Sequence, residues 1–144
     1  MSFQWLQLRI QEEKDRRQRE MLTLERLPVA LEELHGILKD GVRAYTEAFG
    51  EGTVEIVLLP SRIKITTRDP EDVRSQPIAK VEVTIAGELP GFRIERDENS
   101  VDVEVGILGS NNLFYRDRQR DVYLNMEDLT RRVLDPVLFP KLGE

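Results

Sequence analysis

The sequence predicts an α+β fold: an antiparallel meander sheet of about five strands, with a long or kinked N-terminal helix and a short C-terminal helix packed on one face. Three observations lead to this prediction. The chain has 144 residues, which suits one domain of ordinary size. Before Gly50, apolar residues recur every three or four positions, as in a helix. After Gly50, apolar and polar residues alternate in short segments separated by turn residues, as in strands.

The first 27 residues predict a charged helical extension, followed by a single α+β domain over residues 28–144. Between Arg9 and Glu20 almost every side chain is charged or carries an amide. Three acidic residues each precede a basic residue by four positions, an order that stabilises a solvated helix by about 0.2–0.5 kcal/mol per pair. These pairs are Glu12/Arg16, Glu13/Arg17 and Asp15/Arg19.

Large apolar side chains lie at the free end of this extension, beyond its charged stretch. They are Phe3, Trp5, Leu6 and Ile10. Apolar groups gathered at an exposed end commonly mark an interface. We therefore expect one of two contacts for these side chains: with the core of the same chain, or with a protein partner, including a second copy of this chain.

An apolar stripe of roughly heptad spacing follows the extension. It consists of Leu24, Leu27, Leu31, Leu34, Leu38, Tyr45 and Phe49. Pro28 lies inside the stripe and lacks an amide donor, so we expect a break or a bend near Leu27. Burying such leucines contributes about 1.5–3 kcal/mol each, which requires a cover. We expect the sheet of the same chain to provide it, with the same helix of a second copy as the alternative.

The second half predicts the strands of the sheet. The first two segments are close enough for a tight hairpin across Pro60-Ser61. The polar face of the sheet carries acidic residues, among them Glu82 and Asp102, which we expect to pair with basic residues of neighbouring strands. The five predicted strands are Thr53–Leu59, Arg62–Thr67, Ile78–Ala86, Phe92–Arg96 and Val101–Ile107, with Leu113–Arg116 and Asp121–Leu124 as candidates for further short strands.

A short helix is predicted to close the chain. Asn125 is a good N-cap residue, and Asp128 stands three positions later, as in a capping box. Leu129 and Val133 are spaced to face the core. Because Pro136 restricts the residue before it, we expect the helix to end or bend at Asp135-Pro136.

The composition argues against several classes of chemistry. The chain has no cysteine, which excludes thiolate nucleophiles, disulfides and cysteine-based metal sites. The one histidine, His35, has no metal-ligating or triad context, and the glycines match neither a P-loop nor a dinucleotide motif. The sequence therefore indicates no catalytic residue, no cofactor and no metal ligand.

Net charge and hydropathy restrict the kinds of partner and the cellular location that we expect. The formal charge of −6 disfavours nucleic acid, although local arginine clusters keep a nucleic-acid binder as an alternative. The chain holds no apolar run of about 18 residues and no secretory signal pattern, so we expect a cytoplasmic protein without a membrane span.

One basic segment of the second half is a candidate ligand loop. Its residues are Tyr115, Arg116, Arg118 and Arg120. Basic residues beside aromatic ones can bind acidic ligands, but the interspersed aspartates also fit a solvated loop. An enzyme that uses carboxylates and arginines in a cleft near residues 116–120 is the second hypothesis, and a buried Asp or Glu in an ordered pocket there would favour it. The first hypothesis is a non-catalytic protein-binding or assembly module that acts through the N-terminal helix.

Overall fold

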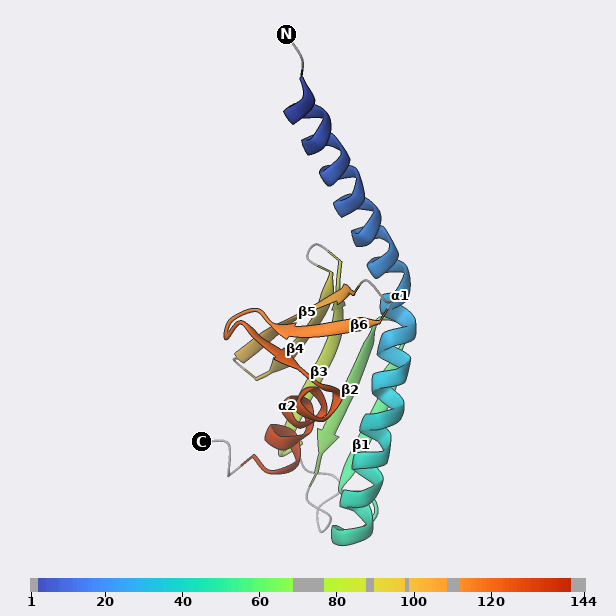
Figure 1. Cartoon of the computed structure of the whole chain (residues 1–144). Helices are drawn as coiled ribbons and strands as arrows, with labels where there is room; N and C mark the ends of the chain where they lie inside the picture. Colours follow the sequence, from blue (N-terminus) through green and yellow to red (C-terminus); the bar gives the residue numbers. More distant parts are fainter. Residues whose placement is uncertain (1–2, 69–76, 88–89, 98, 109–111, 141–144) are drawn as a thin grey trace.

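A computed structural model describes residues 3–68, 77–87, 90–97, 99–108 and 112–140. It confirms the α+β class and the two helices, and its sheet has seven strands in place of the expected five. The order along the sheet is the order along the chain, and every neighbouring pair is antiparallel (Figure 1). The elements are α1 (Gln4–Phe49), β1 (Val54–Leu59), β2 (Arg62–Thr67), β3 (Ala79–Ala86), β4 (Gly91–Arg96), β5 (Asn99–Ile107), β6 (Leu113–Asp117), β7 (Val122–Leu124) and α2 (Met126–Leu138).

The two additional strands are the short segments that the sequence offered only as candidates. β6 pairs along β5, from Val103 opposite Asp117 to Ile107 opposite Leu113, and β7 pairs with β6. Charged residues at the end of β6 interrupt its apolar alternation, which weakens the strand signal. The backbone pairing with β5 and the burial of Tyr115 supply what the local pattern lacks.

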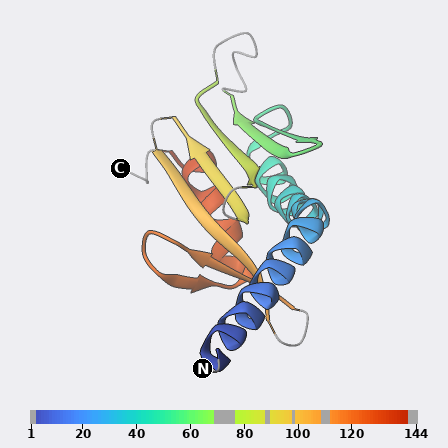
Figure 2. The ribbon, with the colours of Figure 1, turned by 90° about the horizontal axis from the view of Figure 1, so that it is seen from above.

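The sheet is a strongly twisted meander. Figures 1 and 2 show that β1 and β6 run in clearly different directions, which is the accumulated right-handed twist of successive strands. The predicted two-residue hairpin is confirmed, since Leu59 pairs with Arg62 across Pro60-Ser61. The expected loop over residues 68–77 lies mostly outside the described residues.

The core lies between one face of the sheet and the two helices. Four leucines of the stripe on α1 are buried together with valines and isoleucines of β2 to β5 and with α2, which confirms that the sheet of the same chain covers the middle of the stripe, whereas Leu24 and Phe49 at its ends remain exposed. α1 contacts β1, β5 and α2, and α2 contacts β3. A Cβ atom on Gly41 would lie 2.7 Å from Leu134 Cδ1, so the missing side chain at Gly41 lets the helices approach closely. The fully buried leucines of α1 are Leu27, Leu31, Leu34 and Leu38.

The polar face of the sheet carries the expected ion pairs. Glu82 lies 3.8 Å from Arg62 and 3.6 Å from Lys64, and Asp102 lies 3.0 Å from Arg93. These carboxylates therefore serve as cross-strand partners on a solvated face.

Pro28 does not break α1, so of the break or bend expected near Leu27 the break does not occur. The helix is continuous from Gln4 to Phe49, with Pro28 exposed on its outer side. The proline removes the donor for the carbonyl of Leu24, which is itself exposed, so water can satisfy that carbonyl. Figure 1 shows α1 changing direction where it leaves the sheet, which agrees with the alternative expectation of a bend.

α2 starts as predicted and ends later than predicted. Asp128 N donates to Asn125 Oδ1 at 2.7 Å, and both halves of the capping box are present. The helix continues through Pro136 to Leu138, so of the end or bend expected at Asp135-Pro136 the end does not occur. Val137 and Leu138 are buried, and the hydroxyl of Thr67 lies 3.0 Å from the carbonyl oxygen of Val137. The burial of Val137 and Leu138 and this hydrogen bond offset the free energy lost because Pro136 has no backbone N–H to donate within the helix.

Candidate functional site

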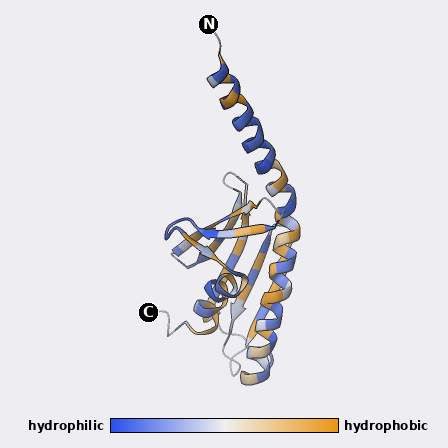
Figure 3. Ribbon diagram, viewed as in Figure 1, coloured by the Kyte–Doolittle hydropathy of each residue, from blue (hydrophilic) through white to orange (hydrophobic). Residues whose placement is uncertain are grey.

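The first part of α1 projects beyond the sheet and forms an arm, which we define as residues 3–22 (Figure 1). The end of the arm nearest the domain lies beside the sheet, since Arg16, Arg19 and Glu20 line a cavity together with residues of β5 and β6. Every side chain of the arm is exposed except that of Glu13, which is half-buried. Burial by the domain begins at Thr23 and Leu27. Figure 3 shows that the arm is mainly hydrophilic, with hydrophobic residues near its free end.

The apolar end of the arm contacts no core of its own chain. The predicted interface residues all remain in water: Phe3, Trp5, Leu6 and Ile10 are 52%, 65%, 40% and 46% exposed. Leu8, which the sequence interpretation did not select, is as exposed as Trp5. The arm therefore holds a cluster of large apolar side chains at the part of the molecule farthest from the sheet (Figure 1).

Charged pairs along the arm support its helical conformation. Glu13 accepts hydrogen bonds from Arg16 at 2.6 Å and Arg17 at 3.1 Å, and Arg16 also donates to Glu20 at 2.7 Å. The two arginines hold the pKa of Glu13 at about 2, below its usual value of 4.5. Of the three predicted pairs, Glu13/Arg17 forms, whereas Glu12 lies 3.5 Å from Arg9 instead.

The stripe that α1 buries on the sheet continues into the arm. Counting back from Leu27 and Leu24 in alternating steps of three and four residues reaches one line of positions. We call this line the seam; it consists of Phe3, Leu6, Ile10, Glu13, Arg17, Glu20 and Leu24. The seam is apolar at both ends and charged in the middle, and Leu24 is 39% exposed. Trp5 and Leu8 lie on the other side of the arm.

The candidate ligand loop does not form a single site. Tyr115 and Arg116 belong to strand β6, and Tyr115 is buried against Phe92 with the ring centroids 6.2 Å apart. Burial raises the pKa of Tyr115 above its usual value, with a further contribution from Glu33. Arg116 points to the opposite face, where it donates to Glu104 at 3.0 Å. The strand alternation therefore separates the residues that the sequence placed together.

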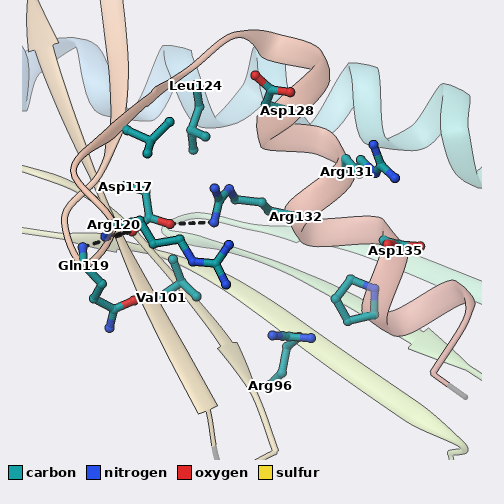
Figure 4. Close-up of a pocket in the computed structure, with 12 residues that line it drawn as sticks. Arg96, Val101, Asp117, Gln119, Arg120, Leu124, Asp128, Arg131, Arg132 and Asp135 are labelled. Atoms are coloured by element: carbon teal, nitrogen blue, oxygen red, sulfur yellow. Dashed lines mark hydrogen bonds and ion pairs between the residues drawn. The ribbon is translucent and has the colours of Figure 1, made fainter. Parts of the chain in front are cut away.

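Arg120 alone of that group reaches a cavity between the sheet and α2, which we call the hollow (Figure 4). It has a volume of about 560 Å³ and is open to solvent. Asp117, buried at its wall, accepts hydrogen bonds from the amides of Gln119 and Arg120 and from Arg132. The buried carboxylate that the enzyme hypothesis requires is thus present, but its oxygens hold the β6–β7 turn and Arg132.

Arg96 and Arg132 also line the hollow, and the sequence interpretation missed both as site residues. Arg96 enters the sequence analysis only as the end of a predicted strand, and Arg132 does not enter it. No local spacing connects residues 96, 120 and 132, because the sheet and α2 bring them together. A pattern search along the chain has no signal for such a site.

Among the described residues, no group of three His, Cys, Asp or Glu side chains lies close enough to hold a metal ion. None of the described helices combines the length and the apolar character that crossing a membrane demands. No protein-family model, no curated protein and no solved structure matches this chain.

Proposed function

We propose that the protein is a non-catalytic assembly module whose arm binds the arm of a second copy in an antiparallel helix pair. The observation that carries the proposal is the exposed apolar end of the arm, on a helix that continues past the edge of its own core. The proposal specifies the protein partner that the sequence analysis left open.

An arm without a partner is unfavourable in free energy, because its helix lacks packing contacts and its apolar side chains are exposed to water. A helix of about 20 residues without tertiary contacts is only marginally stable, even when ion pairs support it. Fully burying large apolar side chains contributes about 1.5–3 kcal/mol each, and Leu6 and Leu24 are still 40% and 39% exposed, so each copy has apolar surface left to bury. A partner helix that covers the seam would recover this free energy.

The charges of the seam favour a second copy in antiparallel orientation. In a parallel pair, each seam residue meets its own equivalent, so Glu13, Arg17 and Glu20 would each face a like charge. In an antiparallel pair, Glu13 of one copy can meet Arg17 of the other, and the two-fold axis produces that contact twice. The arm is thus complementary to itself in one of the two orientations.

The same register pairs the apolar ends. In an antiparallel pair, the residue numbers of two facing positions add up to a constant, because one helix runs up while the other runs down. A register that places Glu13 opposite Arg17 of the second copy therefore also places Leu6 opposite Leu24 of the second copy. Leu24 retains exposed surface for this contact. The arm spans about 30 Å at 1.5 Å per residue, which is enough for both Leu6–Leu24 contacts and both Glu13–Arg17 contacts. Ile10 meets Glu20 of the second copy, which is the weak layer of the pair.

The two alternative functions receive less support. An enzyme near residues 116–120 would need a free general acid or base, whereas Asp117 is engaged in three hydrogen bonds. A nucleic-acid arm would have to work against the formal charge of −6, and two of its basic residues, Arg16 and Arg17, are paired with acidic residues of the same helix.

The mass of the protein in solution tests the proposal. Multi-angle light scattering and sedimentation equilibrium over a range of concentrations should show a dimer for the full chain and a monomer after removal of residues 1–22. Glu13→Arg places arginines against arginines in both central contacts and should weaken the dimer at least about tenfold, roughly 1.4 kcal/mol. The double variant Glu13→Arg, Arg17→Glu should restore it.

Glu12→Arg is the matched control, because it makes the same charge change one residue away and outside the seam. It should leave the dimer unchanged. A full chain that is monomeric at every concentration contradicts the proposal. So does an equal effect of Glu12→Arg and Glu13→Arg.

A further inference from the structure

We propose that the hollow binds a small molecule through a phosphate group, with Arg96, Arg120 and Arg132 as its ligands. This inference concerns a different part of the molecule from the arm and does not depend on the proposed assembly. It rests on the convergence of three arginines, the support that fixes two of them, and the charge and shape of the hollow.

The three guanidinium groups come from three separate elements. Arg96 ends β4, Arg120 lies in the turn between β6 and β7, and Arg132 lies in α2. Figure 4 shows all three side chains directed into the same space, with Val101 beside them. Guanidinium groups present several N–H donors in a plane, which suits the oxygens of a phosphate.

A buried carboxylate holds two of these arginines in place. Asp117 is 1% exposed. Its Oδ2 accepts from Arg132 Nη1 at 2.5 Å, and its Oδ1 accepts from the backbone amides of Gln119 at 3.0 Å and Arg120 at 3.1 Å. The side chain of Arg132 and the backbone of Arg120 are therefore positioned before any ligand arrives, which lowers the entropic cost of binding.

The charge of the hollow is positive. Four arginines (Arg96, Arg120, Arg131 and Arg132) and three aspartates (Asp117, Asp128 and Asp135) line it, which leaves one positive charge in excess to attract an anion such as a phosphate monoester. Within the described parts of the chain, neither Arg96 nor Arg120 has an ion pair with a carboxylate. Their donors are available to a ligand.

The remaining walls define the rest of the ligand. The volume of about 560 Å³ far exceeds a phosphate and lies in the range of small-molecule sites. Val101, Val122, Leu124 and Pro136 contribute apolar surface, whereas Asp128, Arg131 and Asp135 add charged groups to the lining. The aspartates oppose long polyanions, so the hollow fits a molecule with one phosphate and a compact, uncharged body better than a nucleic acid.

Titration calorimetry of the full chain with inorganic phosphate, phenyl phosphate and benzoate tests this inference. Phosphate should bind saturably at millimolar concentration, and phenyl phosphate should bind more tightly because its ring covers the apolar walls. Arg120→Gln and Arg96→Gln should each weaken binding at least about tenfold, the loss expected for hydrogen bonds to a charged group. Arg43→Gln, the same change at an exposed site on α1 outside the hollow, should bind like the unchanged protein.

Arg132→Gln is not a suitable test, because it would leave Asp117 buried without its charged partner and unfold the protein in part. Three results would overturn the inference: absence of saturable binding of both phosphate compounds, benzoate binding as tightly as phenyl phosphate, or equal affinities of the Arg120→Gln and Arg43→Gln variants. Because every one of these measurements can be made on a monomer or a dimer, failure here leaves the proposed assembly untouched.

Discussion

Asp117→Asn is the substitution with the clearest expected effect on stability. Asp117 is buried where β6 ends, and its two oxygens serve different partners. Oδ1 accepts from the amides of Gln119 and Arg120, whereas Oδ2 accepts from Arg132. An asparagine can keep the oxygen that serves the two amides, but its NH₂ group would then face the donors of Arg132.

The structure sets the size of the effect. Losing the charge-assisted bond to Arg132 costs about 1.5–3 kcal/mol, and the two amides then bind a neutral acceptor, which weakens them further. The side chain of Arg132 is 25% exposed, so water can partly solvate it and limit the penalty. We expect a loss of about 2–4 kcal/mol, a large fraction of the 5–15 kcal/mol that typically stabilises a domain.

Urea denaturation followed by circular dichroism measures this loss, and thermal unfolding should show a decrease in Tm of roughly 6–12 °C. Asp121→Asn is the matched control. Asp121 is exposed, pairs with Arg116 at the surface and has a φ of 54°, which asparagine tolerates. Its substitution should cost less than about 1 kcal/mol. If the two variants differ in free energy of unfolding by less than about 1 kcal/mol, the structural role assigned to Asp117 is wrong.

Three further predictions concern α1 and Tyr115. Gly36→Ala should stabilise the protein by about 0.5–1 kcal/mol because a Cβ atom there meets only open space, whereas Gly41→Ala should gain less or destabilise because Leu134 must move; urea denaturation of both variants compares them. The pKa of Glu13 is lowered to about 2, so its contribution to the arm helix should be full above pH 4.5 and disappear as the pH falls toward 2, a change in helical circular dichroism that Glu13→Gln should abolish. Burial raises the pKa of Tyr115 above 10.0, so its contribution to stability should fall as the pH rises past 10, and urea denaturation at several pH values should show a smaller fall for Tyr115→Phe; an identical pH dependence of the variant and the unchanged protein would contradict the assignment.

The arm shows how far local pattern reaches. Helix surface pairs and the apolar spacing of Phe3, Leu6 and Ile10 are properties of neighbouring residues, so the sequence predicted a charged helix with an apolar end. The sequence could not decide whether Pro28 breaks the helix or only bends it. That outcome depends on Leu27 and Leu31 being buried on the sheet on one side while Pro28 faces water on the other.

The candidate ligand loop shows where local pattern fails. The sequence grouped Tyr115, Arg116, Arg118 and Arg120 because they are close in number. Once β6 forms beside β5, alternate side chains point to opposite faces, so Tyr115 enters the core and Arg116 pairs with Glu104. The hollow instead unites Arg96, Arg120 and Arg132, whose numbers are far apart.

Periodicity therefore determined which segments of this chain become helix and strand, and which face of each is apolar, because those properties arise from backbone geometry within a few residues. Tertiary structure alone decided that two weak segments become β6 and β7, that α2 continues through Pro136, and that Asp117 meets Arg132. These outcomes depend on hydrogen bonds and packing between residues distant in sequence, whose free energy exceeds the local preferences that oppose them.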